Sequence, residues 1–506
     1  MNKPLESENA DALITGAAFS QFPFAYAKRH GAFLEWQPEG PVLCYKEGIA
    51  PEVFGETQRV IGGDFAVQKL DDGVFQQRLT DAFQAGSQET MQMVQSLGDD
   101  MDLTDLANAV PESEDVLEQG GDAPIIRLIN ALIAEAIKIK ASDIHVETFD
   151  KHMLVRFRVD GVLREMARPR RQLAPMLVSR IKVMAQLDIA EKRVPQDGRI
   201  SLLIGGRNVD VRVSTMPASN GERVVLRLLD QQAAHLNLTS LGMPDQLMHN
   251  MQKLLRRPHG IFLVTGPTGS GKTTTLYAGL TDINDTSRNI LTVEDPIEYN
   301  IEGIGQTQVN IKADMTFARG LRAILRQDPD VVMVGEIRDR ETADIAVQAS
   351  LTGHMVLSTL HTNTAVGAIT RLRDMGVEQF LLSSSLTGVL AQRLVRTLCK
   401  NCREGHTADE AELEVLGLPT TDTVTIYTAD GCSECGQTGY TGRTGIYELI
   451  VVDDDIKNLV HSNASEEEIV QLSRRKHHSI RADGRARVLD GTTSIEELLR
   501  VTQEGS

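Results

Sequence analysis

The pattern of apolar and polar positions changes along the chain and divides it into regions. Residues 1–98 mix short apolar runs with polar stretches and include a predicted helix at residues 75–97. Residues 99–122 are acidic, and no Lys or Arg lies between Arg78 and Arg127. Such a stretch has too little apolar surface to offset the entropy of ordering. We therefore predict a docking domain at residues 1–98 and a mobile linker at residues 99–122, with a short solvated helix inside the linker as the alternative.

The next region opens with an apolar stripe at helical spacing, which predicts a helix with Asp122 as its N-cap and Pro124 in its first turn. Short apolar runs separated by Gly and Asp turns then predict strands at residues 144–147, 153–159, 200–203, 208–213 and 223–229. We expect a small α+β domain over residues 123–235. On its strands lie Arg199, Arg212 and Arg227, and because a charge on a half-buried sheet needs a partner, we interpret them as members of structural salt bridges.

Apolar strands alternate with helical stretches between residues 236 and 396. The predicted strands are residues 261–265, 290–293, 331–334 and 355–359. This alternation is typical of an α/β domain with a mainly parallel sheet, helices on both faces, and a ligand at the carboxyl ends of the strands. A cysteine-containing segment follows at residues 397–445. Charged amphipathic helices, including residues 465–476 and 494–502, then predict a helical subdomain at residues 446–506.

The clearest candidate site follows the strand at residues 261–265. Gly266-Pro-Thr-Gly-Ser-Gly271-Lys272-Thr273 matches the phosphate-loop pattern between a strand and a helix. Glycines let several backbone N–H groups face one anion, and the helix N-terminus adds partial positive charge. Lys272 is predicted to reach the β- and γ-phosphates, and the Thr273 hydroxyl to bind Mg²⁺. The predicted nucleotide-binding residues are Gly266, Pro267, Thr268, Gly269, Ser270, Gly271, Lys272, Thr273 and Thr274.

Two acidic groups follow other strands of this region. Glu336 comes just after the apolar run at residues 331–334, where the acid of a Walker B motif is expected. The position before it, which often holds a second carboxylate, is Gly335. We therefore predict that Glu336 acts alone and either orients the attacking water or holds Mg²⁺ through water. Glu294, Asp295 and Glu298 end the strand at residues 290–293 and form either a second part of the site or a solvated turn.

Basic side chains lie between and after these acidic groups. A helix predicted at residues 316–327, with Thr316 as its N-cap, carries Arg319, Arg322 and Arg326 on one face. Arg338 follows Glu336 by two positions. Such a face is usually a solvated salt-bridge surface, but its place between two acidic segments favours contact with a γ-phosphate of the same or the next subunit. His361, at the carboxyl end of the strand at residues 355–359, is placed to sense that phosphate.

Two C-x-x-C pairs, Cys399 with Cys402 and Cys432 with Cys435, predict a structural zinc site with four thiolate ligands. The gap of 29 residues between the pairs is longer than the usual spacing of about 15 to 20 residues, and we expect it to hold a helix at residues 408–416. An iron–sulfur cluster and a redox pair are the alternatives. The fifth cysteine, Cys44, is predicted to be a buried, small apolar residue.

Charge and hydropathy limit the possible partners. The formal net charge of −18 argues against a nucleic-acid binder, which needs a basic surface. The N-terminus lacks the layout of a signal peptide, and no run of about 18 apolar residues is present. We expect a cytoplasmic protein that reaches a membrane only through a partner.

Together these motifs resemble the secretion ATPase superfamily, and specifically the type II secretion system ATPases. The resemblance covers residue 122 to the C-terminus and rests on five segments in order: the phosphate loop, the acidic box at residues 290–299, the run ending Gly335-Glu-Ile-Arg-Asp339, the histidine box at residues 351–361 and the tetracysteine segment. It implies a RecA-like P-loop ATPase domain preceded by a PAS-like α+β domain. It also implies a homohexamer that binds ATP between these two domains and drives pseudopilus assembly and the export of folded proteins.

The resemblance also implies residue roles. Lys272 and Thr273 become the phosphate and Mg²⁺ ligands, and Glu336 becomes the catalytic carboxylate. From their places in the sequence, we also count Glu298 and His361 among the candidate catalytic residues. Arg212 and Arg227 become γ-phosphate contacts from the α+β domain, which revises their interpretation as structural salt bridges. The arginines implied to couple subunits are Arg322, Arg326, Arg338 and Arg443. Residues 1–98 are implied to dock on the cytoplasmic part of an inner-membrane platform protein, which places the ATPase on the cytoplasmic face of the bacterial inner membrane.

Other functions share part of this evidence. A type IV pilus assembly ATPase has the same motifs, but its N-terminal region tends to be longer. A pilus retraction ATPase resembles a shorter chain without the cysteine segment. A DNA-transfer motor disagrees with the acidic balance, and a non-catalytic scaffold disagrees with an intact Lys272 and Glu336.

Overall fold

The structure is a computed structural model that describes residues 27, 30–37, 40–61, 63–75, 78, 122–204, 207–229 and 237–502. The chain divides into two compact units, Met1–Gln231 and Gln232–Ser506. Most of the predicted helix at residues 75–97 and nearly all of the predicted linker at residues 99–122 lie outside the described residues.

The described part of the first unit includes a three-stranded sheet in the order β1-β2-β3. β1 (Ala32–Gln37) and β2 (Gly40–Tyr45) are antiparallel, whereas β3 (Ala66–Lys69) is parallel to β2 and follows the crossover helix α2 (Glu52–Ile61). The rings of Phe33 and Phe75 meet edge to face, 5.3 Å apart. Cys44 is buried in the same core, as predicted, and burial raises the pKa of its thiol to about 11.

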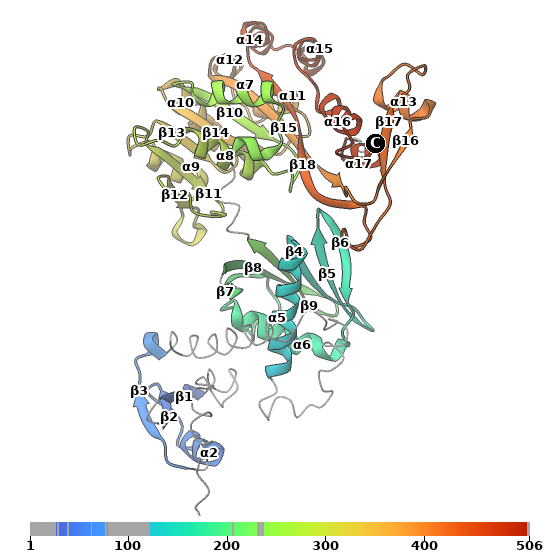
Figure 1. Ribbon diagram of the computed structural model, residues 1–506. Helices are drawn as coiled ribbons and strands as arrows, with labels where there is room; N and C mark the ends of the chain where they lie inside the picture. Colours follow the sequence, from blue (N-terminus) through green and yellow to red (C-terminus); the bar gives the residue numbers. More distant parts are fainter. Residues whose placement is uncertain are drawn as a thin grey trace, which may run out of the picture. The chain divides into compact units, whose positions relative to one another are not determined.

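A second sheet of this unit has six antiparallel strands in the order β6-β5-β4-β9-β8-β7 (Figure 1). The strands are β4 (Asp143–Thr148), β5 (Met153–Val159), β6 (Val162–Ala167), β7 (Gln196–Ile204), β8 (Arg207–Ala218) and β9 (Gly221–Leu229). Two helices, α5 (Asp122–Lys138) and α6 (Ala174–Met184), share its apolar core. This arrangement confirms the small α+β domain, although α5 begins at Asp122 itself. β6 was not predicted because most of its residues are only partly buried and the apolar alternation is weak.

The second unit contains a seven-stranded sheet in the order β12-β11-β13-β14-β10-β15-β18 (Figure 1). Its strands are β10 (Gly260–Thr265), β11 (Ile290–Glu294), β12 (Gly305–Gln308), β13 (Val331–Val334), β14 (Met355–Leu360), β15 (Leu386–Leu398) and β18 (Tyr440–Val451). Every neighbouring pair is parallel except β15 and β18. The mainly parallel sheet of the prediction is confirmed.

Helices cover both faces of this sheet, and the side chains of β10 alternate between them. Phe262 and Val264 pack with α7 (Asp245–Leu255) and α8 (Lys272–Ile283). Ile261 and Leu263 point to the opposite core. That core is formed by α9 (Phe317–Ile324), α10 (Arg340–Leu351), α11 (Ala365–Asp374), α12 (Gln379–Ser385), α14 (Asp454–His461) and α15 (Glu466–Lys476). A sheet buried on both faces explains why its strands read as continuous apolar runs.

The cysteine segment lies between β15 and β18 and carries β16 (Arg403–Thr407), α13 (Glu410–Leu416) and β17 (Thr425–Ala429). α13 begins two residues later than predicted because Asp409 and Glu412 form a capping box there. The last helices, α16 (Ile480–Leu489) and α17 (Ile495–Thr502), share a core with this segment. β15 and β18 were not predicted. The Leu, Ala, Gln and Arg residues of β15 favour a helix, and β15 is a strand only because it pairs with strands that are distant in the sequence.

Candidate functional site

The loop between β10 and α8 adopts a backbone that glycine permits. Gly266 has a φ of 150° and Gly271 a φ of 86°. A Cβ atom at Gly266 would lie 2.3 Å from the Gln392 carbonyl oxygen and 2.6 Å from Ser270 Oγ, so a larger residue does not fit. Gly271 is the N-cap of α8 and provides no side-chain cap. The first N–H groups of α8 therefore form the kind of uncapped helix N-terminus that binds anions.

The Lys272 side chain folds over this loop. Its Nζ donates to the Gly266 carbonyl oxygen at 2.8 Å and to the Pro267 carbonyl oxygen at 3.0 Å. Burial lowers the pKa of Lys272, and the negative charge of Glu336 partly opposes that shift. Lys272 and Glu336 are thus close enough to interact, as two parts of one site must be.

Gln392 on β15 is a site residue that the sequence did not reveal. Its Nε2 donates to the Ser270 carbonyl oxygen at 2.7 Å, and its Oε1 accepts from Thr275 Oγ1 at 2.6 Å. The side chain is buried, and it joins the phosphate loop to the first turn of α8. The run Leu390-Ala-Gln-Arg-Leu394 carries no motif, so only the pairing of β10 with β15 places Gln392 at the loop.

Glu336 follows β13 and is held by two basic side chains. Arg338 Nη2 donates to Glu336 Oε1 at 2.5 Å, and His361 Nε2 lies 3.2 Å from Glu336 Oε2. Burial raises the pKa of Glu336, but the hydrogen bonds and charges of Arg338 and His361 outweigh it and hold that pKa below its ordinary value. The predicted grouping of Glu336, Arg338 and His361 is therefore present.

Gly335, the residue before Glu336, packs closely against neighbouring elements. A Cβ atom at Gly335 would lie 3.3 Å from Phe317 Cε1 and 3.5 Å from the Val293 carbonyl oxygen. Its own carbonyl accepts from Thr359 Oγ1 at 2.7 Å, which ties it to β14. A side chain at this position would start in contact with the Phe317 ring, and Glu336 is the first acid after β13.

The three acidic residues at the end of β11 differ in their burial and in their contacts. Glu294 is 2% exposed, so it is not the solvated acid of the simple turn interpretation. The hydrogen bond and the charge of Glu336, and then the charge of Asp295, raise the pKa of Arg338, so Asp295 acts on the same group of charges. Glu298 is half-buried, and its backbone N donates to Tyr277 OH at 3.3 Å.

Helix α9 begins after Thr316, whose Oγ1 accepts from the Arg319 backbone N at 3.2 Å, as predicted. It ends at Ile324, so Arg326 lies in the turn after α9 and not on the helix face where it was predicted. Arg322 Nη1 donates to Glu341 Oε1 at 2.6 Å, and Arg326 Nη1 donates to the Arg322 carbonyl oxygen at 2.9 Å. Both side chains line a groove of about 520 Å³ between α9 and α10. Within the described part of the chain, neither guanidinium hydrogen-bonds to the phosphate loop or to Glu336.

In the first unit, Arg199, Arg212 and Arg227 form one cross-strand row on β7, β8 and β9. Arg199 Nη2 donates to Asp210 Oδ2 at 2.6 Å, and Arg227 Nε donates to Asp143 Oδ1 at 2.9 Å. The salt bridges predicted for Arg199 and Arg227 are therefore confirmed. The side chains of both remain 57% exposed, so a further contact to these guanidinium groups is sterically open.

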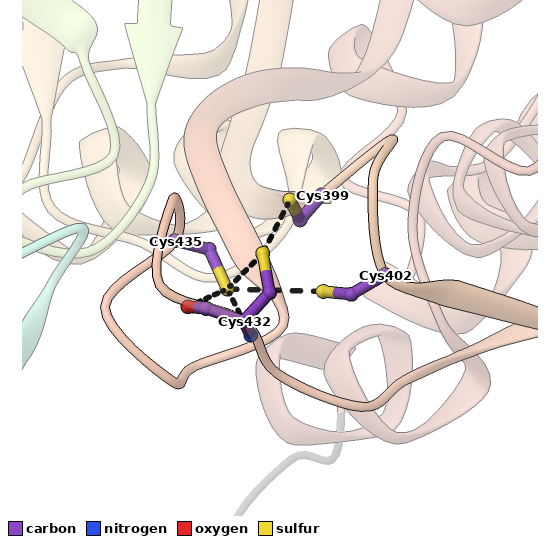
Figure 2. A group of neighbouring side chains, drawn as sticks. All are labelled: Cys399, Cys402, Cys432 and Cys435. Atoms are coloured by element: carbon purple, nitrogen blue, oxygen red, sulfur yellow. Dashed lines mark hydrogen bonds between the residues drawn. The ribbon is translucent and has the colours of Figure 1, made fainter.

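The four cysteines of the two C-x-x-C pairs converge between β15 and β18 (Figure 2). Sulfur–sulfur distances are 3.9 Å for Cys399 and Cys432, 3.8 Å for Cys402 and Cys435, and 3.7 Å for Cys432 and Cys435. Four thiolates about 2.3 Å from one tetrahedral zinc ion would lie roughly 3.8 Å apart. The backbone N–H groups of Cys432 and Gly439 donate to Cys435 Sγ at 3.2 Å each, which favours a thiolate. The residues present therefore fit a structural zinc ion.

A parallel sheet with a phosphate loop after β10 and an acid after β13, separated by β14, defines a RecA-like P-loop ATPase. The chain belongs to the family described as Type II/IV secretion system protein, whose model matches residues 118–500. A second family model, for a domain of GSPII protein E, matches residues 21–83. Membership in this ATPase family confirms the expected enzyme class.

Relatives support the same assignment over nearly the whole chain. The type II secretion system protein E of Pseudomonas aeruginosa is 62% identical over 98% of this chain and 98% of its own length. The type II secretion system ATPase E of Vibrio cholerae is 58% identical over 96% of this chain and 97% of its own length. These matches confirm the resemblance to type II secretion ATPases.

Solved structures agree on the fold. The pilus retraction motor PilT with bound ADP is 27% identical, with a TM-score of 0.50 over 74% of this chain and 96% of that chain. The Legionella pneumophila ATPase DotB is 22% identical, with a TM-score of 0.55 over 74% of this chain and 94% of that chain.

Among the helices of the described residues, none has the length and apolar character that crossing a membrane requires.

Proposed function

We propose that the chain hydrolyses ATP at the phosphate loop, as a homohexamer, to drive pseudopilus assembly and the export of folded proteins by type II secretion. The observation that carries this proposal is the grouping of Lys272, Glu336, Arg338 and His361 at one edge of the sheet. The names of the relatives and the ADP bound by PilT support it.

The proposed roles follow from the chemistry of each group. Backbone N–H groups of the loop and Lys272 would hold the phosphates, and Thr273 would hold Mg²⁺, which supplies charge neutralisation when bound. Glu336 orients the attacking water, with His361 and Glu298 beside it. Arg338 holds the Glu336 carboxylate in place. Arg212 and Arg227 complete the γ-phosphate contacts from the α+β domain, and the exposed guanidinium group of Arg227 supports this role.

We also propose the partners and the division of the chain. Residues 1–98 dock on the cytoplasmic domain of an inner-membrane platform protein, which the match to a domain of GSPII protein E supports, and this holds the ATPase at the cytoplasmic face of the membrane. The remaining segments are a linker (99–122), an α+β domain (123–235), the ATPase domain (236–396), a tetracysteine zinc subdomain (397–445) and a helical subdomain (446–506).

The test is specific ATPase activity of the full chain against protein concentration. Lys272→Ala should abolish turnover, because it removes the phosphate-loop charge without disturbing the core. A trans-acting arginine is worth about 10³–10⁵ in rate. Wild-type activity per chain should therefore rise steeply with assembly, and Arg326→Ala should lose that rise. Arg319→Ala is the matched control, since Arg319 lies on α9 shortly before Arg326 and pairs locally with Asp314. Equal activity per chain in monomer and hexamer would refute catalysis across subunits, and turnover by Lys272→Ala would refute the site itself.

A further inference from the structure

Glu294, the last residue of β11, is a buried carboxylate whose hydrogen-bond donors are all neutral within the described residues. Its Oε1 accepts from Thr292 Oγ1 at 2.6 Å and from Gln306 Nε2 at 3.0 Å, and its Oε2 accepts from Tyr277 OH. A carboxylate removed from water is stable only when its lone pairs are satisfied. Both oxygens are engaged here, so Glu294 is an internal anchor rather than an acid that faces the phosphate loop.

Tyr277 connects this anchor to the nucleotide site. It lies on α8, five residues after Lys272, and is 1% exposed. Its hydroxyl donates to Glu294 and also accepts from the Glu298 backbone N at 3.3 Å. Burial, and then the charge of Glu294, raise the pKa of Tyr277, so the phenol stays a neutral donor. One hydroxyl group therefore joins the helix of the phosphate loop to the backbone of the acidic box.

Gln306 on β12 holds the rest of the acidic box. Its Nε2 donates to the Tyr299 carbonyl oxygen at 3.2 Å, and its Oε1 accepts from the Ile301 backbone N at 2.7 Å. The Tyr299 ring packs edge to face on Tyr277, with centroids 4.7 Å apart. Three backbone positions after the strand are thus fixed by two side chains, although connecting segments are generally more mobile than the elements they join.

We infer that Tyr277 is a positioning residue for hydrolysis, which fixes Glu298 relative to the helix that starts at Lys272. This inference rests on the proposed role of Glu298 in the ATPase site. Misplacing a catalytic group by about 1 Å can cost on the order of a hundredfold in rate, so a single hydrogen bond to the Glu298 backbone has a measurable effect.

The first measurement is steady-state ATP hydrolysis by the full chain carrying Tyr277→Phe, which keeps the ring and deletes the hydroxyl. We expect kcat to fall about tenfold while KM for ATP changes less than about twofold, because the phosphate loop itself is untouched. Tyr299→Phe is the matched control, since it keeps the ring that packs on Tyr277 and the Tyr299 hydroxyl makes no hydrogen bond to any described residue, and it should keep the wild-type kcat. A wild-type kcat in Tyr277→Phe, or an equal loss in Tyr299→Phe, would overturn the inference.

The second measurement separates positioning from a general structural effect. If Tyr277 acts through Glu298, adding Tyr277→Phe to a Glu298→Ala chain should change kcat less than about twofold. If kcat instead falls by the same factor as in the wild-type background, Tyr277 acts independently of Glu298 and the inference is overturned. If Tyr277→Phe does not fold, Gln306→Met carries the same cycle, because Gln306 Nε2 also donates to the Tyr277 hydroxyl at 3.4 Å. Wild-type kcat in Glu298→Ala would overturn the positioning inference alone, because ATP hydrolysis at the loop is judged separately by Lys272→Ala.

Discussion

Replacing Gln392 with leucine tests whether β15 shapes the phosphate loop. The substitution removes the donor to the Ser270 carbonyl oxygen and the acceptor of the Thr275 hydroxyl, at 2.7 Å and 2.6 Å in the native chain. Both bonds are buried. Each buried polar group left without a partner costs about 1–3 kcal/mol, so the native loop conformation should lose about 2–6 kcal/mol. The loop can relax and recover part of this, but relaxation moves the N–H groups that bind phosphate.

The assay is equilibrium binding of ATP to the full chain, with thermal unfolding measured in parallel. Since about 1.4 kcal/mol is a factor of ten in affinity, a loss of even 2 kcal/mol raises Kd more than tenfold. Gln348→Leu is the matched control, because it makes the same chemical change at an exposed position of α10. Gln392→Glu adds a second test, as its carboxylate keeps the Thr275 bond but faces the Ser270 carbonyl with a second acceptor. Unchanged Kd in both Gln392 variants would refute the claim that this side chain holds the loop.

Three further outcomes are expected. Glu336→Gln should bind ATP normally and hydrolyse it far more slowly, with Glu467→Gln, at an exposed position of α15, as the control; loss of binding instead would make Glu336 mainly a Mg²⁺ ligand. Cys432→Ser with Cys435→Ser should release about one zinc per chain and unfold the tetracysteine segment, and iron or no metal in the purified wild type would contradict the zinc assignment. Glu497→Gln should destabilise the fold by about 3 kcal/mol in chemical denaturation, because Glu497 is 1% exposed and accepts from Arg396 and Arg500. Burial raises the pKa of Glu497, but the hydrogen bonds and charges of the two arginines outweigh burial and hold that pKa below the ordinary glutamate value. The stabilisation is therefore fully present above the ordinary glutamate pKa and is lost as pH falls through the lowered pKa of folded Glu497, so a gap that persists in strong acid would contradict the ion-pair origin.

Local sequence patterns predicted the phosphate loop, Glu336 and the four cysteines, because each depends on spacing within a short segment. The strands on either side of the loop were also predictable, since a sheet covered on both faces leaves continuous apolar runs. Gln392 was not, because its place depends on a parallel pairing of β15 with β10, more than a hundred residues away in the chain. The burial of Glu294 was not predictable either. Glu294, Asp295 and Glu298 form one acidic cluster in the sequence, but Glu294 is buried in the structure.

Three glutamates of the second unit show that the neighbouring side chains of a carboxylate determine its chemical role. Glu294 has neutral donors on both oxygens, and Glu497 is closed in by two arginines, so neither can approach a water molecule at the loop. The Glu336 side chain keeps 14% exposure between Arg338 and His361. Because these neighbours hold the pKa of Glu336 below its ordinary value, its carboxylate is a weak base at neutral pH. Such a group orients and polarises a water more effectively than it removes a proton, and this favours the water-orienting role proposed for Glu336 over that of a strong general base.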